Sequence, residues 1–394
     1  MFSQVASRLD AEVNPLYRIR DELRSQGHTI LDLISGNVNE SGIVFPQDAL
    51  EPILIRALHD SRIYHPDSFG QKPARQAVSQ YYQKQGFEVP PENIVLTPGT
   101  SIAYWYCFKL LANDGDEILC PRPSYPLFDY IAALSGVRLV PYRLDEQKSW
   151  AIDLDSLEKS ISTRTRALVL ISPHNPTGHL SSAEEIAALA EIAARHELAI
   201  INDEVFSEFL HGAEALSRPA DPAPVVITLN GFSKMFALPG MKLGWMALSG
   251  QNDRIKQALR ALELISDTFL PVNEIVQAAV PDIFRSGETF LREYSWEIKA
   301  RWKDAERILR QSRHVCFVPP GGGYYVTLQL LDLVEDTAAA AILRQEHCLV
   351  HPGFFYDIDG DHLVLSFVQE REQIRTILPR ILRVLDHCHF SNDK

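Results

Sequence analysis

No stretch of the 394-residue chain approaches the roughly 20 consecutive apolar residues that a membrane-spanning helix requires, so the sequence does not predict a membrane protein. Basic residues are outnumbered too: 38 lysines and arginines stand against 51 aspartates and glutamates, a formal net charge of -13. This balance disfavours nonspecific binding to nucleic acid or to anionic membranes. The partners that we expect are small molecules or another protein chain.

Cysteine is scarce, and the few cysteines are widely spaced, odd in number and without a CxxC pair. This argues against a disulfide framework and against a zinc site. Histidine shows no HExxH or comparable pattern, and we expect no metal. With no export signal at the amino terminus, a reducing cytoplasm is the expected location. The cysteines are Cys107, Cys120, Cys316, Cys348 and Cys388.

Short apolar runs alternate with helix-like segments over much of the chain. The alternation predicts an α/β protein whose large domain holds a mostly parallel, seven-stranded sheet covered by helices. Ser182 and Glu185 form a capping-box pattern at the start of the best-defined connecting helix. The expected strands are residues 94–98, 117–121, 137–142, 167–173, 198–203, 225–230 and 243–248.

After about residue 275 the pattern changes to a long, charged helical stretch followed by short strand candidates, which indicates a second, smaller α+β domain. Pro379 should kink the last helix or begin a new turn. The segment before residue 40 is expected to pack with the smaller domain or with a second subunit. The predicted division is an N-terminal arm that forms part of the small domain at 1–40, a large cofactor-binding domain at 41–280 and a C-terminal small domain at 281–394.

Reactive side chains follow the carboxyl ends of several expected strands, where open α/β sheets bind ligands. Lys234 follows the strand at 225–230, and a buried lysine with a depressed pKa is a Schiff-base nucleophile. Asn175 and Asp203 follow two neighbouring strands. A carboxylate at the end of a buried strand needs a cationic partner, and a protonated pyridine nitrogen is one. Together the three side chains suggest an aldehyde cofactor, pyridoxal phosphate.

Two further segments extend this site. Gly99 and Thr100 follow the strand at 94–98, and a glycine turn before a helix capped by Thr100 would offer free N–H groups to a phosphate. Tyr125, between two prolines, could stack on a planar ring. Each feature also has an ordinary structural interpretation. A glycine before a helix is a common connection, Tyr125 could be a loop aromatic, and Glu204 could form only a salt bridge.

Several separated motifs resemble, in their order, those of the class I and II (fold-type I) pyridoxal-phosphate aminotransferases, over about residues 28–390. The motifs are GDEILCPRPSYPLF, NPTG, DEVF and SKMFALPGMKLGW. The resemblance implies a transferase that moves an amino group between an amino acid or related amine and a 2-oxo acid. By similarity, Lys234 forms the Schiff base and later moves a proton, Asp203 pairs with the pyridine nitrogen, and Asn175 bonds the phenolic oxygen. Tyr125 stacks on the ring.

The resemblance also implies a homodimer, because Tyr64 matches a tyrosine that reaches the phosphate of the neighbouring subunit. The catalytic residue that the resemblance implies is Lys234. The implied cofactor-binding residues are Tyr64, Gly99, Thr100, Ser101, Tyr125, Asn175, Asp203, Phe206, Ser233 and Lys242.

Three positions near the implied cofactor depart from the family pattern. Phe206 replaces a tyrosine and removes a hydroxyl from the cofactor's phenolic oxygen. Gly231 stands where a phosphate-binding serine is common. Lys242 replaces an arginine, which keeps the charge but loses the bidentate fork. We still expect phosphate to be bound.

The largest departure lies near the carboxyl end, where the family usually has an arginine that clamps the substrate's α-carboxylate. Val364 occupies the aligned position, so either the substrate is not a plain α-amino acid or another arginine binds it from a different direction. The candidates are Arg18, Arg20 and Arg371.

Two alternative functions remain open at this stage. The same constellation of residues serves pyridoxal-phosphate lyases, decarboxylases and synthases. A noncatalytic homologue could bind a ligand or regulate a partner, although the chain has neither the spare length nor the basic charge for a DNA-binding domain.

Overall fold

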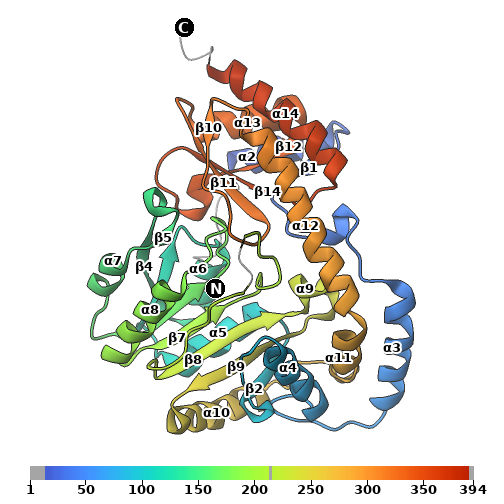
Figure 1. Ribbon diagram of the computed structural model, residues 1–394, viewed down its shortest axis with the longest axis vertical. Helices are drawn as coiled ribbons and strands as arrows, with labels where there is room; N and C mark the ends of the chain where they lie inside the picture. Colours follow the sequence, from blue (N-terminus) through green and yellow to red (C-terminus); the bar gives the residue numbers. More distant parts are fainter. Residues whose placement is uncertain (1–13, 213–214, 390–394) are drawn as a thin grey trace, which may run out of the picture.

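The computed structural model describes residues 14–212 and 215–389. The N-terminal arm expected at 1–40 is therefore described from residue 14 onward. Figure 1 shows a large central sheet flanked by helices, with a smaller sheet and its own helices above it. Within the described ranges, no helix combines the length and apolar character that crossing a bilayer requires.

The central sheet contains the seven predicted strands and one more at its edge. Five neighbouring strands run parallel, whereas the strand at 244–250 is antiparallel to both of its neighbours. The extra strand has two residues and pairs antiparallel with the edge of the parallel set, so the sheet has eight strands and not seven. The order is β2 (Ile94–Thr97), β9 (Gly244–Gly250), β8 (Val225–Gly231), β7 (Ala199–Asp203), β6 (Thr165–Ile171), β3 (Glu117–Arg122), β4 (Arg138–Asp145) and β5 (Ala151–Ile152).

Both faces of this sheet are buried, which explains why its central strands are apolar at nearly every position. Alternate residues of each strand belong to different cores: Leu168 packs with one face and Val169 with the other. One face is covered by α5 (Thr100–Leu111), α6 (Leu127–Ser135) and α10 (Asn252–Asp267), and the other by α7 (Leu154–Lys159) and α8 (Ala183–Arg195).

The start of α8 confirms the predicted capping box. The Ser182 hydroxyl accepts a hydrogen bond from the Glu185 amide at 3.2 Å, and the Glu185 carboxylate accepts one from the Ser182 amide at 2.9 Å. Beyond the β2 edge of the sheet, α3 (Gln47–Asp60), α4 (Lys72–Lys84) and α11 (Glu274–Ser286) share a third core.

The smaller sheet is antiparallel and has the order β10 (Val315–Cys316), β11 (Tyr325–Leu330), β14 (His362–Ser366) and β13 (His351–Pro352). The N-terminal segment joins this part of the molecule through a separate two-stranded sheet, in which β1 (Leu31–Asp32) pairs in parallel with β12 (Cys348–Leu349). Its helices are α2 (Pro15–Ser25), α12 (Glu288–Leu309), α13 (Glu335–Glu346) and α14 (Arg371–His389), and α14 runs through Pro379 as one helix. The remaining short helices are α9 (Phe232–Met235), η1 (Val38–Ser41), η2 (Pro91–Asn93), η3 (Glu146–Lys148), η4 (Pro239–Met241) and η5 (Gly353–Tyr356).

The topology brings the chemically active segments to one edge. The parallel strands β6, β7 and β8 end side by side, and the residues that follow each of them meet there. The segment between β10 and β11 of the smaller sheet contacts the same edge, because the amide of His211, beyond β7, donates to the oxygen of Gly321 at 2.8 Å. A site at this edge is therefore enclosed by both parts of the molecule.

Candidate active site

Two adjoining cavities lie at the carboxyl ends of the parallel strands. The smaller, of about 250 Å³, reaches Thr100, Asp203 and Gly231. The larger, of about 1170 Å³, extends toward α2 and the small sheet. Both are lined by Tyr125, Leu127, Asn175, Ser233, Lys234 and Tyr325. Lys234 therefore lies on the border between a deep chamber and a wider one.

Lys234 is on α9, one turn after β8, and is partly buried. Its amine donates a hydrogen bond to the Gly36 oxygen at 3.1 Å and lies 5.8 Å from the centroids of both Phe206 and Tyr324. Burial without a carboxylate partner lowers the pKa of Lys234 from 10.5 to about 8. Near neutral pH a useful fraction of the amine is therefore unprotonated and nucleophilic.

Asp203 ends β7 inside the smaller cavity and is only 7% exposed. Its carboxylate accepts hydrogen bonds from the Tyr104 hydroxyl at 2.8 Å and the Val205 amide at 3.0 Å, but forms no salt bridge with any residue in the described ranges. Burial raises its pKa to about 6. A cationic ligand atom would relieve this cost, as a protonated ring nitrogen does.

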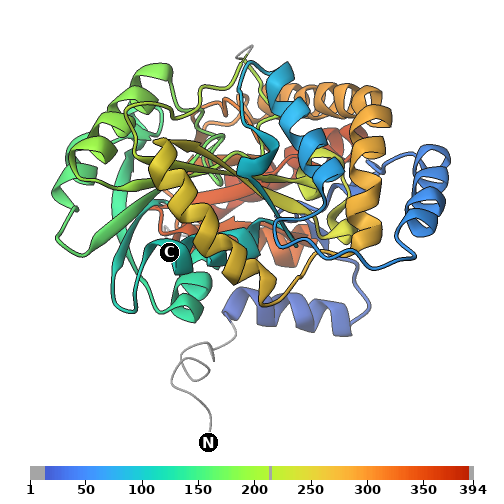
Figure 2. The same ribbon diagram turned by 90° about the horizontal axis from the view of Figure 1, so that it is seen from below.

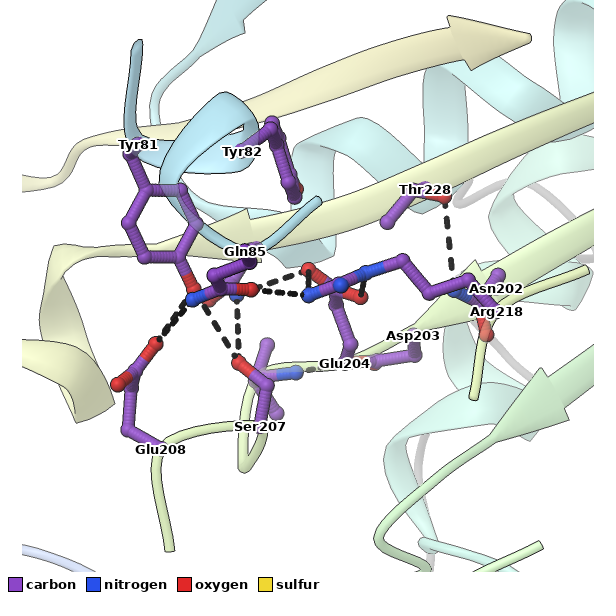
Figure 3. A network of polar contacts seen from close by, with 12 residues as sticks. Tyr81, Tyr82, Gln85, Asn202, Asp203, Glu204, Ser207, Glu208, Arg218 and Thr228 are labelled. Atoms are coloured by element: carbon purple, nitrogen blue, oxygen red, sulfur yellow. Dashed lines mark hydrogen bonds and ion pairs between the residues drawn. The ribbon is translucent and has the colours of Figure 1, made fainter. Parts of the chain in front are cut away.

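Glu204 is the next residue, and its side chain belongs to a different network, shown in Figure 3. It is fully buried, and the Arg218 guanidinium bonds its two oxygens at 2.6 and 3.2 Å. Arg218 also donates to Gln85, the residue after α4, at 2.5 Å. The salt-bridge interpretation is thus confirmed for Glu204, which leaves Asp203 as the carboxylate available to a ligand.

Asn175 lines both cavities after β6. Its Oδ1 atom is buried and has no hydrogen-bond partner among the described residues. Leaving such an atom unpaired costs about 1–3 kcal/mol, so an unpartnered amide facing a cavity indicates a polar ligand there.

The start of α5 differs from the predicted cap. Thr100 is the first helical residue and not the cap, which is Gly99. Gly99 has φ +100°, a conformation that glycine adopts without strain, and it offers no side-chain cap to the first turn. The first amide groups of α5 therefore keep their capacity to bind an anion, and Thr100 and Ser101 line the smaller cavity.

Gly231 has a steric explanation. A Cβ at this position would lie 2.7 Å from the Leu243 oxygen and 2.9 Å from the Gly244 Cα, both in the backbone of the neighbouring segment. No serine fits there without moving β8 from β9. Ser233, two residues later, lines both cavities and supplies a hydroxyl close by.

Three predicted cofactor-binding residues do not line either cavity. Gly99 packs against Gly244, and Lys242 is exposed. Tyr64 is 66% exposed and lies beside Gln277 in a separate small cavity. Within one chain, Tyr64 does not reach the site.

Phe206 lies in the wall of the smaller cavity and is 3% exposed. Tyr324, just before β11, and Tyr325, its first residue, approach Phe206 edge-on, with ring centroids 4.8 and 6.2 Å away. Sequence reasoning missed three contributors: Gly36, Tyr104 and Tyr325. Only Tyr104 had a local signal, because it lies four residues after Thr100 and so shares its helix face.

Val364, which is aligned with the family's arginine, and the three alternative arginines lie in different parts of the structure. Val364 is fully buried in β14, paired with Thr327 and His351, and lines neither cavity. Arg18 is exposed, and Arg371 bonds Asp304 at 2.7 Å elsewhere in the small domain. Arg20 lines the larger cavity.

Comparison with known proteins gives a consistent result. The family described as aminotransferase class I and II matches residues 30–381. Glutamate-pyruvate aminotransferase AlaA of Escherichia coli K12 is 36% identical over 387 residues, covering 95% of both chains. AlaA of Haemophilus influenzae is 31% identical over 382 residues, 93% of this chain and 94% of the relative.

Solved structures agree with this family. An Escherichia coli aminotransferase has a TM-score of 0.88 at 28% identity, covering 99% of both chains. Alanine aminotransferase from Pyrococcus furiosus has a TM-score of 0.90 and covers 98% of this chain and 100% of its own; at 23% identity it supports the fold alone.

Proposed function

The chain belongs to the class I and II aminotransferases, and we propose that in this pyridoxal-phosphate-dependent enzyme Lys234 is the residue that bonds covalently to the cofactor. The observation that carries the proposal is the position of Lys234. Its amine has a lowered pKa, and Lys234 lies on the border between the two cavities and lines the smaller one together with a buried carboxylate and an unpartnered amide. The named relatives are aminotransferases, which favours amino transfer over lyase, decarboxylase or regulatory roles.

The residues of the smaller cavity suit the cofactor at each end. Bound pyridoxal phosphate supplies an aldehyde and an electron-accepting ring. Asp203 would hold the ring nitrogen protonated, Asn175 would bond the phenolic oxygen, and Tyr125 would lie against the ring. Thr100 and Ser101, with Ser233, would bind the phosphate at the start of α5. Lys234, on the border of the two cavities, would accept a proton from the substrate's Cα as general base and donate a proton as general acid.

Replacing the lysine tests this assignment. We expect Lys234→Ala to lose the visible absorbance of a covalently bound cofactor and at least about 10³-fold in turnover. Lys256→Ala, at an exposed position of α10, is the matched control and should behave as the wild type. Unchanged absorbance and turnover in Lys234→Ala would exclude the lysine from the reaction.

We also propose a homodimer in which Tyr64 completes the partner's phosphate site. Tyr64 follows a row of exposed apolar side chains on and after α3: Ile55, Leu58 and Ile63 are 63%, 57% and 69% exposed. Figures 1 and 2 both place α3 at the margin of the molecule, away from the central sheet. Such a patch favours burial against another chain.

Sedimentation of the wild-type protein measures directly whether it is a dimer. A second experiment tests the shared site: a mixture of Lys234→Ala and Tyr64→Ala chains, refolded together, should recover activity in the hybrid dimer that carries one unaltered site. A monomer at micromolar concentration, or no recovery, would count against a shared site.

For substrates, we propose an amino acid donor and a 2-oxo acid acceptor, both carrying a carboxylate. The relatives' names specify alanine, glutamate and pyruvate, which makes these the first compounds to assay. Formation of a keto product with stoichiometric pyridoxamine phosphate would support amino transfer, whereas release of ammonia without pyridoxamine phosphate would contradict amino transfer.

We also propose a cytoplasmic location, with which the scarce, unpaired cysteines agree.

A further inference from the structure

A 2-oxo acid carries a carboxylate, and a carboxylate that enters a partly closed cavity needs a cation or several hydrogen-bond donors. Apart from its tyrosines, the larger cavity has four titratable side chains in its lining: Arg20, Asp21, Lys234 and His351. Burial lowers the pKa of His351 to about 4, so this imidazole is neutral near pH 7. Lys234 serves the cofactor. Arg20 remains as the permanent cation of the lining.

Arg20 lies on α2 with its guanidinium carbon 4.6 Å above the Tyr17 ring. Its Nε and Nη2 atoms are both 2.8 Å from one oxygen of Asp21, the next residue. The Asp21 side chain is 56% exposed and that of Arg20 is 25% exposed. An exposed pair of this kind contributes only about 0–1 kcal/mol, so a ligand carboxylate can replace Asp21 at small cost.

The Tyr17 ring beneath Arg20 is fixed by the small sheet. The Tyr17 hydroxyl is 2.9 Å from His351 Nε2, and the other ring nitrogen of His351 is 3.2 Å from the Tyr356 hydroxyl. This chain of three side chains holds α2 against β13. It gives the guanidinium a stacking surface that cannot rotate freely, which reduces the entropy lost when a ligand is bound.

The hydrogen-bonded side chains of Tyr17, His351 and Tyr356 lie next to the position on β14 where the family pattern has an arginine. His351 is the register partner of Val364, so the apolar side chain and the fixed imidazole lie side by side in the β13–β14 pair. A buried valine supplies neither a charge nor a hydrogen bond to the cavity. The cation of the larger cavity therefore comes from helix α2 and not from strand β14.

We propose that Arg20 binds the carboxylate of the substrates, with Tyr17 as its stacking platform and Asp21 as the partner that the substrate carboxylate displaces. The inference rests on the proposed function, because it assumes that carboxylate-bearing substrates enter the larger cavity. It makes Arg20 a specificity-determining residue and explains how amino transfer tolerates Val364.

Steady-state kinetics of the holoenzyme with L-alanine, L-glutamate and pyruvate test the proposal. Loss of a charged hydrogen bond costs about 1.5–3 kcal/mol, so Arg20→Gln should raise KM for these compounds about 10- to 100-fold. The content of bound cofactor and the melting temperature should not change. Arg20→Lys should recover part of the affinity, since it keeps the charge without the fork. Arg18→Gln, exposed on the same helix, is the matched control.

A substitution of Asp21 distinguishes carboxylate binding by Arg20 from a merely structural role of Arg20, because a structural role would leave KM unchanged. Asp21→Asn removes the competing carboxylate and should lower KM for pyruvate, about 2- to 5-fold for an exposed pair of this strength. If Arg20→Gln stays within about 2-fold of the wild type, or if Asp21→Asn raises KM, Arg20 does not bind the carboxylate. If the wild-type holoenzyme converts none of the three compounds, the proposed substrate class fails, and the inference fails with it.

Discussion

The amine of Lys234 and the backbone oxygen of Gly36 are joined by a hydrogen bond of 3.1 Å, although 198 residues separate them in the sequence. Residue 36 has no room for a side chain. A Cβ there would lie 2.8 Å from the Lys234 amine and 2.7 Å from the Tyr325 hydroxyl. The backbone after β1 thus lies so close to the Lys234 amine and the Tyr325 hydroxyl that only a glycine fits at residue 36.

Gly36→Ala should therefore displace the lysine without unfolding the protein. We expect weaker or slower cofactor capture by at least about tenfold, which corresponds to about 1.4 kcal/mol, measured by the rise in visible absorbance of the apoenzyme. Gly240→Ala is the control, because a Cβ at that glycine meets nothing within 4 Å. Equal capture rates in the two variants would mean that the close approach is relaxed at no cost.

The lowered pKa of Lys234 predicts a particular pH dependence. Only the neutral amine attacks an aldehyde, so the rate of cofactor capture should rise about tenfold per pH unit below pH 8. It should level off above about 8 and not continue to rise toward 10.5. Stopped-flow absorbance between pH 6 and pH 10 covers the range. A plateau that begins only above pH 10 would show that burial does not affect this amine.

Asp203 should destabilise the apoenzyme, because its pKa is raised from 3.8 to about 6. The folded form binds the proton more tightly in this window, so the carboxyl's contribution becomes unfavourable as pH rises through it. Asp203→Asn should raise the free energy of unfolding at pH 7 by up to about 3 kcal/mol, and have little effect near pH 4. Urea unfolding of apoenzyme at both pH values measures this difference. A loss of stability at pH 7 would mean that the charged form is already well compensated.

The same substitution should have the opposite effect on function. Asparagine cannot hold the ring nitrogen protonated, so we expect Asp203→Asn to lose turnover even though the apoenzyme is more stable. Turnover equal to the wild type would remove Asp203 from the cofactor site.

The Glu204–Arg218 pair should respond as a buried ion pair does (Figure 3). Arg218→Met leaves the fully buried Glu204 carboxylate without its cation and should cost about 3–5 kcal/mol. Adding Glu204→Gln to this variant should restore much of that loss. Denaturant unfolding of the two single variants and the double variant gives the coupling energy. Additive losses would mean that the two side chains do not depend on each other.

Much of the fold could be read from local patterns. Strands buried on both faces must be apolar at nearly every position, which is why the seven apolar runs coincide with seven strands of the sheet. The strand Ala151–Ile152 is not predictable from the sequence, because two residues carry no periodicity and pair only where the edge of β4 is free. Residue type alone predicts Thr100 as the cap, whereas the backbone of Gly99 decides where α5 begins.

The core of the candidate site was also predictable, for a topological reason. Asn175, Asp203 and Lys234 follow strands that are parallel neighbours, so side chains at the same end of those strands converge however the rest of the chain is arranged. Residue type then restricts the chemistry to a lysine amine, a carboxylate and an amide.

What the sequence alone determined is this strand-end chemistry and the family that it resembles. The contacts between distant segments required the tertiary structure: Gly36 beneath the lysine, Tyr104 on Asp203, and His351 beside the Tyr17 hydroxyl. These contacts depend on how α2, β1 and the small sheet close over the edge of the central sheet. No local pattern encodes such packing, because each residue is ordinary in its own segment and acquires its role only from a partner far along the chain.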